Sequence, residues 1–426
     1  MTAAEESGKT PGRLASDPEA TEKGLPRNPR IKFHFKREEF DFFFQWLAGM
    51  QSHGGVSIGE AYYAASRIRE GDIESWEREW TELARRVERR AEASEASGHR
   101  VSARESLLRA YTYYRAPLAF ISPLAEPDRY RSTYEHARDR FRRATSYFDA
   151  PIEAVEIPFR DAALPGYFLK PDAAAVRRKT LLMIGGGDTF AEDLYYYLGP
   201  AALNRNYNYI FVDLPGQGLL PFQGLVWPER AEEPVGAVLD YLCDRPDVDT
   251  DRVAIFGLSG GGHLAPRAAT GEKRIKACVA CALILDFSAV WNRRFVELNQ
   301  KAQRSLPYRL LKSFFAWKRR AYFNMVDTYV WRFGLQSAAD LIDATRNYTV
   351  DPAKISCPFF NIVAQQEYEQ SSGMMIAARE AQRHISHETN DLVIMPADEG
   401  ADSHGVGTNL GLLSQVTFDW LDTALQ

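Results

Sequence analysis

Residues 253–269 read VAIFGLSGGGHLAPRAA, and this stretch decides the fold. The apolar run Val253–Phe256 predicts a strand and the small residues after Gly261 predict a helix, with Gly257-Leu258-Ser259-Gly260-Gly261 between them. This is the G-x-S-x-G turn, a tight strand-to-helix connection that presents a serine at the end of the strand. Glycines on both sides of the serine let the backbone turn without a steric clash. The stretch therefore predicts that Ser259 is a nucleophile. A serine that merely occupies a turn is the alternative.

An activated serine needs a histidine base. In proteins with this turn, the histidine comes later in the sequence than the serine. The helix predicted after Gly261 is called the elbow helix below, because it follows the sharp turn, or elbow, at Ser259. Three of the eight histidines lie beyond it in the chain. His384 and His387 belong to a polar helix end, and His263 is directed under the sheet by the elbow helix itself. His404 follows the predicted strand Asp391–Met395 on a loop rich in Gly, Asp and Ser. We therefore predict that His404 is the base, with a solvated loop histidine as the alternative.

The acid that orients the base is expected after the penultimate strand. Phe359–Val363 is an apolar run of the buried type, and Glu367 follows it after one small residue and two variable ones. Glutamate in place of aspartate is an accepted variant of this arrangement. Glu369 is the local alternative. Asp286, after the predicted strand Ala277–Leu285, is the distant one.

An oxyanion formed at the serine needs two convergent backbone N–H groups. One is expected from Gly260, the residue after the nucleophile. The other is expected from the triple glycine that follows the predicted strand Thr180–Ile184, with the amide of Gly187 as first choice and that of Asp188 close behind. Neither a G-x-x-x-x-G-K-[ST] phosphate loop nor a metal-ligand spacing such as H-E-x-x-H occurs, so we expect no cofactor and no metal.

The composition indicates a globular protein. The chain has 426 residues, of which 45% are hydrophobic, enough for a packed core, and its net charge is −5 at a pI of about 6.0. This charge gives no reason to expect nucleic acid or a membrane surface as a partner, so a small-molecule substrate is the expected one. The four cysteines lie in or beside apolar stretches, and the first residues contain no apolar segment, so no signal peptide is expected. Both observations predict reduced thiols in a cytoplasmic protein.

Three zones with different patterns follow one another along the chain. Residues 1–29 are polar and rich in Pro, Gly, Glu and Lys, which predicts a disordered tail. Residues 30–150 show helical patterns throughout and are predicted to form an N-terminal cap domain. Residues 151–426 alternate apolar strands with helices, which predicts an α/β core with a mostly parallel, doubly wound sheet. A helical, aromatic and basic insertion at about 287–350 interrupts this core and is predicted to be a lid over the serine.

Motifs spread over roughly residues 60–424 carry a family resemblance. They are GDIESW (71–76), GHRVSARESLLRAYTYYR (98–115), IEAVEIPF (152–159), LPGYFLKPD (164–172), DLPGQG (213–218), FGLSGGGHLAPRAA (256–269) and EGADSHGVGTNL (399–410). On these motifs the chain resembles a group of α/β-hydrolases that includes the bacterial 2,6-dihydroxypseudooxynicotine hydrolase, the fungal yellowish-green pigment hydrolase and, more distantly, the fermentation–respiration switch esterases. The resemblance implies the α/β-hydrolase fold and places the family's nucleophile, acid and base on Ser259, Glu367 and His404. His263 departs from the pattern, because relatives commonly carry an aromatic residue there.

The resemblance also implies a reaction. Better-known members cleave a carbon–carbon bond next to a ketone in an aromatic or polyketide substrate, so we expect a serine hydrolase that cleaves such a bond, an ester or a thioester. A non-hydrolytic acyltransferase, a cyclase or an eliminating lyase on the same fold is the alternative. The aromatic residues within 287–335 also make a homodimer a possible assembly.

Overall fold

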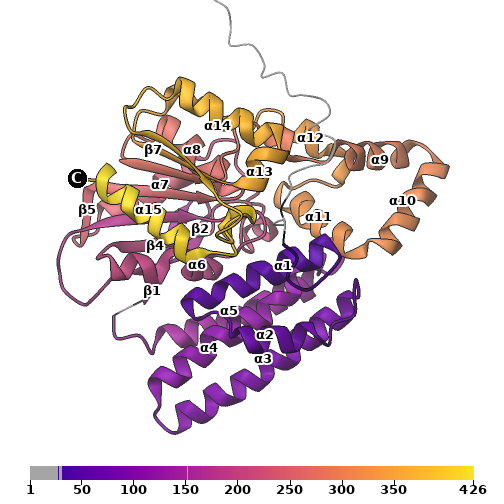
Figure 1. Ribbon diagram of the computed structural model, residues 1–426, viewed down its shortest axis with the longest axis horizontal. Coiled ribbons are helices and arrows are strands. Elements are labelled where there is room, and N and C mark those ends of the chain that lie inside the picture. The colour runs from indigo at the N-terminus through magenta and orange to yellow at the C-terminus, as the bar shows by residue number, and fades with distance from the viewer. Residues whose placement is uncertain (1–26, 28–30, 151) are drawn as a thin grey trace, which may run out of the picture.

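An eight-stranded sheet forms the centre of the computed structural model, which describes residues 27, 31–150 and 152–426 (Figure 1). The predicted tail of residues 1–29 lies outside the described residues except for Arg27. The strands follow the order β1-β2-β4-β3-β5-β6-β7-β8, and all neighbours pair in parallel except β1 with β2 and β2 with β4. Their bounds are Ile152–Phe159 (β1), Ala162–Leu169 (β2), Arg178–Ile184 (β3), Asn208–Val212 (β4), Val248–Leu258 (β5), Ala277–Cys281 (β6), Phe359–Ala364 (β7) and Asn390–Met395 (β8).

Helices cover both faces of this sheet, because alternate residues of each strand point to opposite sides. In β3, Leu181 and Met183 belong to one apolar core, whereas Leu182 and Ile184 belong to the other. The first core is shared with α6 (Ala191–Asn204), α15 (Leu410–Ala424) and the N-terminal helices; the second is shared with α7 (Glu232–Cys243), α8 (Gly261–Gly271) and α14 (Ser372–His384). The strands are therefore apolar on both faces, as expected of a buried parallel sheet.

The region before the sheet consists of helices. They are α1 (Glu38–Gly49), α2 (Ile58–Ala65), α3 (Ile73–Ala96), α4 (Arg100–Arg115) and α5 (Pro127–Thr145). Helix α3 begins after Asp72, whose carboxylate accepts the N–H of Ser75 at 3.0 Å and caps the helix. Its buried side consists of apolar residues at spacings of three and four, among them Trp76, Trp80 and Leu83.

Buried polar contacts tie these helices to the core. Arg115 of α4 forms an ion pair with Asp193 of α6 at 3.0 Å, and both side chains are almost fully buried. Tyr111 donates a hydrogen bond to the same carboxylate at 2.8 Å. Trp46 of α1 donates its indole N–H to the hydroxyl of Tyr197 at 2.7 Å. Because each of these groups would lose its partner if the helices moved away, the contacts fix the N-terminal helices on the sheet.

A second helical segment lies between β6 and β7 and projects from the core (Figure 1). It contains α9 (Arg293–Arg304), α10 (Leu306–Lys318), α11 (Arg320–Arg332) and the short α12 (Leu341–Ala344), which together fall within the predicted insertion. The strand predicted before it was too long: β6 ends at Cys281, not at residue 285. Residues 282–285 are buried without being in the sheet, since the N–H of Ile284 donates to the carbonyl of Gly262 at 3.1 Å. Burial alone therefore accounts for their apolar character.

Candidate active site

Ser259 occupies a strained turn between β5 and α8. Its φ of +57° lies in the left-handed region, which side chains other than glycine rarely adopt. The turn is tight enough that a Cβ on Gly257 would come within 2.0 Å of the carbonyl oxygen of Gly261, so only glycine fits there. This geometry holds the serine hydroxyl above the carboxyl end of the central strand, as the G-x-S-x-G pattern predicts.

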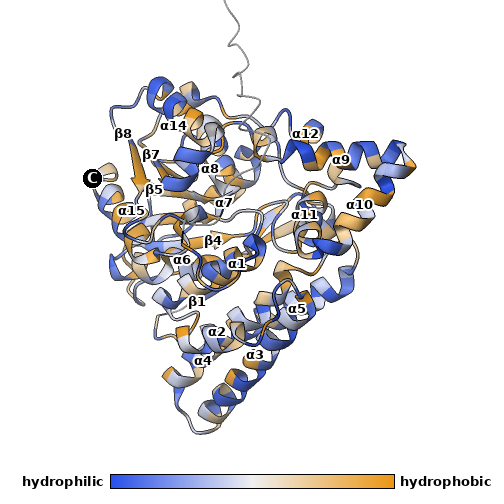
Figure 2. Cartoon of the chain, turned by 45° about the vertical axis from the view of Figure 1, so that its right-hand side comes forward, coloured by the Kyte–Doolittle hydropathy of each residue, from blue (hydrophilic) through white to orange (hydrophobic). Residues whose placement is uncertain are grey.

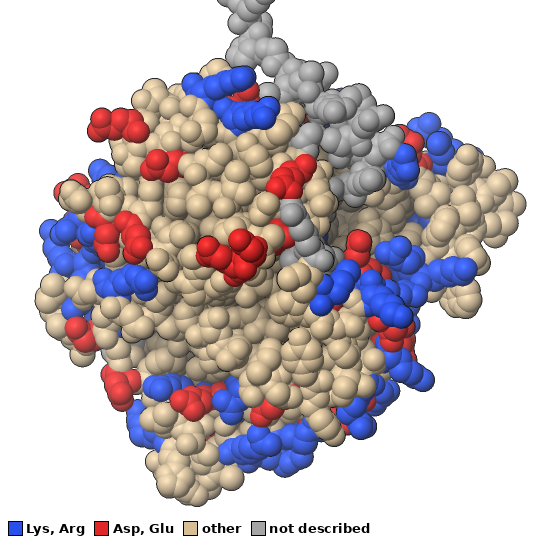
Figure 3. All heavy atoms as spheres, in the orientation of Figure 1, with Lys and Arg blue, Asp and Glu red and all other residues tan. Residues whose placement is uncertain are grey.

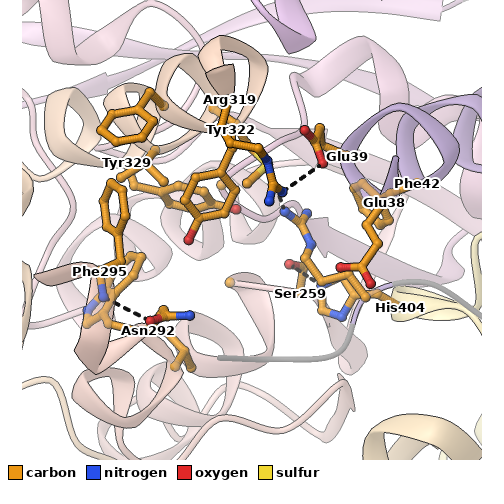
Figure 4. Close-up of a pocket in the computed structure, with 18 of the residues that line it drawn as sticks. Glu38, Glu39, Phe42, Ser259, Asn292, Phe295, Arg319, Tyr322, Tyr329 and His404 are labelled. Carbon is orange, nitrogen blue, oxygen red and sulfur yellow. Dashed lines mark hydrogen bonds and ion pairs between the residues drawn. The ribbon is translucent and has the colours of Figure 1, made fainter. Parts of the chain in front are cut away.

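His404 and Glu367 meet at Ser259 from two different loops. The Nε2 atom of His404 lies 2.7 Å from the Ser259 hydroxyl oxygen (Figure 4). Its Nδ1 atom is hydrogen-bonded to a carboxylate oxygen of Glu367. Glu367 belongs to α13 (Gln365–Gln370), directly after β7, and His404 lies beyond β8. The Glu367 and His404 side chains are 1% and 6% exposed, so water does not screen their interaction. A serine whose proton can pass to an oriented imidazole is an activated nucleophile.

The other candidate residues have different surroundings. Asp286 accepts hydrogen bonds from the N–H and hydroxyl of Ser288, at 2.9 and 2.7 Å. Glu369 accepts one from the side-chain amide of Gln365 at 2.8 Å. Of the three candidate acids, Glu367 is the one whose carboxylate is bonded to the His404 ring among the described residues. His263 is fully buried beneath the elbow, where burial lowers its pKa to about 4 and its Nδ1 lies 3.1 Å from the carbonyl oxygen of Ile284.

The glycine loop after β3 touches the serine. A Cβ on Gly186 would lie 2.6 Å from the Cβ of Ser259 and 2.9 Å from the backbone nitrogen of Gly260. Gly187 and Gly260 both line the same cavity as Ser259. Gly260 is the N-cap of α8, so its N–H points out of the helix end without an intrahelical acceptor. Two backbone segments thus converge where an oxyanion from Ser259 would form.

The side chain of Asp188, whose amide stays the second candidate for the oxyanion donor, points away from the serine. It does not line the cavity; its carboxylate accepts the Tyr329 hydroxyl at 2.6 Å and pairs with Arg27. Burial alone would raise the pKa of this carboxyl, but the charge of Arg27 and the bond from Tyr329 hold it below its usual value. Its carbonyl accepts a hydrogen bond from Arg115. These contacts anchor the residue after Gly187, so Asp188 holds the glycine loop in place.

Arg27 reaches the site from the N-terminal segment. Its carbonyl oxygen accepts the backbone N–H of His404 at 3.1 Å, and its guanidinium lies 4.0 Å from the ring centroid of Phe42. With its bond to Asp188, this residue contacts both the histidine loop and the glycine loop. The sequence offered no signal for it, because it lies in a polar stretch predicted to be disordered. Phe42 lies in the aromatic run of α1, which did indicate burial but not a place in the site.

A cavity of about 710 Å³ opens above Ser259 (Figure 4). This volume is typical of a small-molecule site. One wall comes from α1 and the other from α9, α10 and α11, whereas Ser259, Gly260 and His404 lie on the core side. Many aromatic side chains line it, including Phe42, Trp291, Phe295, Phe315, Tyr322 and Tyr329, together with charged ones such as Glu38 and Arg294. An ion pair of 3.3 Å between Glu39 and Arg319 joins the two walls. The cavity therefore suits an apolar or aromatic molecule.

The part of the chain that the structure describes has neither a metal-binding cluster nor a membrane-spanning helix. It holds no group of three or more His, Cys, Asp or Glu side chains arranged to bind a metal ion. None of its helices is long and apolar enough to cross a membrane.

Comparison with known proteins places the chain in a family. A model of FrsA-like esterases matches residues 61–294. The alpha/beta hydrolase gkaG of Penicillium citrinum is 37% identical over 273 residues, which are 61% of this chain and 62% of that protein. The 20-hydroxy-prefusarin hydrolase FUS2 of Gibberella moniliformis is 30% identical over 352 residues, 76% of this chain and 81% of that protein.

A solved structure has the same fold. The 2,6-dihydroxy-pseudo-oxynicotine hydrolase superposes with a TM-score of 0.68 at 20% identity, covering 88% of this chain and 95% of that one. At this identity the likeness concerns the fold, and it agrees with the mostly parallel sheet described above. The chain therefore belongs to the FrsA-like esterase family and is an enzyme, a hydrolase of the α/β-hydrolase fold.

Proposed function

We propose that this enzyme is a serine hydrolase that cleaves an acyl bond in an aromatic or polyketide-like small molecule. Ser259 is the nucleophile, His404 the general base and Glu367 the acid that orients it. The observation that carries the proposal is the 2.7 Å contact between the Ser259 hydroxyl and His404 Nε2, at a strained turn that faces a 710 Å³ cavity. A serine without a chemical role has no need of a left-handed backbone or an oriented imidazole.

The first half-reaction forms an acyl-enzyme. His404 Nε2 takes the proton of Ser259 as the serine oxygen bonds to the carbonyl carbon of the substrate. The carbonyl oxygen becomes an oxyanion, which the N–H groups of Gly260 and Gly187 stabilise. Glu367 keeps the proton on Nδ1, so that Nε2 is free to accept, and its charge stabilises the imidazolium that forms.

Collapse of the tetrahedral intermediate breaks the bond between the acyl carbon and the leaving group. The electron pair of that bond leaves with the group, and His404 returns its proton to it. When the leaving atom is carbon, the pair must be delocalised as an enolate or phenolate before protonation, which requires a β-diketone or acyl-phenol substrate. Water, deprotonated by His404, then attacks the acyl carbon and releases a carboxylic acid and free Ser259.

The walls of the cavity support the substrate class. Their aromatic side chains offer stacking surfaces to a planar or conjugated molecule, and aromatic pairs gain about 0.5–1.5 kcal/mol beyond burial. The names of the two similar enzymes, a 20-hydroxy-prefusarin hydrolase and a 2,6-dihydroxy-pseudo-oxynicotine hydrolase, also denote hydrolases of small organic molecules. Cleavage of a carbon–carbon bond next to a ketone is the reaction we favour within this class.

The test compares the wild type with Ser259→Ala, and with Ser66→Ala as a control serine outside the cavity. Each is incubated with p-nitrophenyl acetate, an acyl thioester and an aromatic β-diketone, and intact mass and products are measured in ¹⁸O-labelled water. We expect an acyl adduct and a labelled carboxylate with the wild type and Ser66→Ala, and neither with Ser259→Ala. Turnover that survives Ser259→Ala would overturn the role of the serine. A product without solvent oxygen would instead identify an acyltransferase, cyclase or lyase.

A further inference from the structure

Helix α10 is exposed along its whole length. None of its thirteen residues is buried, and its main packing partners are its neighbours α9 and α11 at the outer end of the insertion (Figure 1). Yet it is rich in large apolar side chains, with Leu310 63% and Trp317 76% exposed (Figure 2). Contiguous apolar surface of this kind is rare on a monomer and marks an interaction site.

The apolar residues of α10 are arranged on faces. Leu306, Leu310, Phe314 and Trp317 follow one another at spacings of four, four and three, so they form a single outward stripe. Phe315 lies on a different side of the helix, where it lines the active-site cavity while remaining 41% exposed. Helix α10 therefore carries apolar side chains both on its outward stripe and on the side that lines the cavity.

The segment that contains α10 is basic, and Glu297 and Asp327 stand at its two ends. Residues 298–326 contain seven Lys or Arg and no Asp or Glu, although the whole chain carries a net charge of −5. Arg319 and Arg320 pair with Glu39 and Glu74 of the N-terminal helices, and Lys301 lies near Glu297. The other four, which form no ion pair within the described residues, are Arg304, Arg309, Lys312 and Lys318. Figure 3 shows the resulting projection as a largely uncharged lobe flanked by Lys and Arg.

We propose that α10 docks reversibly on an anionic lipid surface, with its Leu306–Trp317 stripe inserted among the acyl chains and its basic residues on the headgroups. An amphipathic helix that combines Trp, Phe and Leu with Lys and Arg has the chemistry that such a surface recognises. Basic residues near an anionic membrane add an electrostatic attraction that depends on salt. A symmetric dimer through the same stripe would bring two basic helices together, because both copies use the same patch. Charge complementarity therefore favours the lipid over a second copy of the chain.

Docking would serve the active site. Resting on the function proposed above, it brings the helix that contributes Phe315 to the cavity wall against the phase in which an apolar substrate dissolves. The net charge of the chain predicted no membrane partner. The net charge does not reveal the basic segment at 298–326, because acidic residues elsewhere in the chain outnumber the basic ones.

The experiment measures co-sedimentation of the full chain with vesicles of phosphatidylcholine alone and of an equal mixture of phosphatidylcholine and phosphatidylserine. We expect binding to the mixed vesicles that weakens at high salt. The affinity of the double variant Leu310→Ser/Trp317→Ser for the mixed vesicles should be lower by a factor of at least about ten, since the variant lacks two large inserting side chains. Arg309→Gln/Lys312→Gln should lose the preference for anionic vesicles. Val101→Ser/Val176→Ser, which changes two exposed apolar residues outside the insertion, is the matched control and should bind like the wild type.

Three results would contradict the proposal. They are absence of binding to the mixed vesicles, equal binding by the Leu310/Trp317 variant, and a dimer in sedimentation velocity that this variant dissociates while vesicles bind neither protein. Hydrolysis of soluble p-nitrophenyl acetate is recorded in parallel and should be unchanged in the variant, since neither side chain lines the cavity. Vesicle binding needs no catalysis, so failure of docking and failure of the hydrolase function give different readouts.

Discussion

Replacing Glu367 by Gln tests the proposed triad most directly. The side chain is 1% exposed, and its second carboxylate oxygen has no hydrogen-bond partner among the described residues. An amide of the same shape therefore fits the site without opening a cavity. The substitution removes the charge that faces His404. Either the oxygen or the NH₂ group of the new amide can then face the imidazole ring. An oxygen toward Nδ1 preserves the productive tautomer, whereas an N–H toward Nδ1 forces the proton onto Nε2, which then cannot accept from Ser259.

The size of the effect follows from these two cases. If the tautomer is kept, the imidazolium loses one charge-assisted hydrogen bond worth about 2 kcal/mol, which lowers kcat about 30-fold. If the tautomer is reversed, the loss approaches the factor of about 10⁴ known for the equivalent change in a Ser-His-Asp triad. We therefore expect kcat to fall between about 30-fold and about 10⁴-fold with KM little changed, because Glu367 does not line the cavity.

The assay is steady-state hydrolysis of p-nitrophenyl acetate, together with the rate at which a fluorophosphonate labels Ser259. Glu369→Gln and Asp286→Asn are the matched controls, since both were candidate acids. We expect each to stay within about threefold of the wild type, because neither carboxylate contacts the base: Glu369 is exposed, and Asp286 is bonded to Ser288 instead. The reasoning is refuted if Glu367→Gln retains wild-type kcat, or if Asp286→Asn loses as much activity as Glu367→Gln does.

Two further predictions concern the surroundings of the serine. Because burial lowers the pKa of His263 from 6.5 to about 4, the unfolded chain binds a proton between these pH values that the folded chain excludes, so stability falls by about 3 kcal/mol as pH drops through this window. His263→Phe should remove this dependence, and urea unfolding at pH 7 and pH 4 measures it; an unchanged pH slope in the variant would count against it. Gly186→Ala should lower kcat about 100-fold by displacing Ser259 or Gly260 from the oxyanion position, whereas Gly59→Ala, whose Cβ would meet nothing within 4 Å, should leave kcat unchanged.

The central sheet and the three proposed catalytic residues could be expected from sequence because local rules determine them. The elbow needs glycine at fixed offsets from Ser259, and the acid and base follow successive strands in chain order. Parallel strands end at one edge of a sheet, so residues far apart in the chain, such as Glu367 and His404, are brought together without any sequence signal between them.

The cavity walls were less predictable, since helical spacing identifies an apolar side chain but not its neighbour. Leu310 and Phe315 belong to the same helix and have similar chemistry, but Leu310 faces solvent and Phe315 lines the cavity. Which of the two side chains lines the cavity depends on where α9 and α11 lie relative to α10. Arg27 is harder still, because its place depends on two loops more than 150 residues away, those of Asp188 and His404. Tertiary contacts of this kind leave no pattern in the local sequence.

The buried ion pair between Arg115 and Asp193 has a consequence for engineering this enzyme. The change of pattern near residue 150 invites a cut there, to exchange the leading helices for those of a relative or to produce the sheet alone. A truncated chain would leave the Asp193 carboxylate and the hydroxyl of Tyr197 facing water across an apolar surface that α1 and α4 now cover. Chimeras should therefore carry α1–α5 and α6 from the same parent, and specificity is better altered by changing α9–α11.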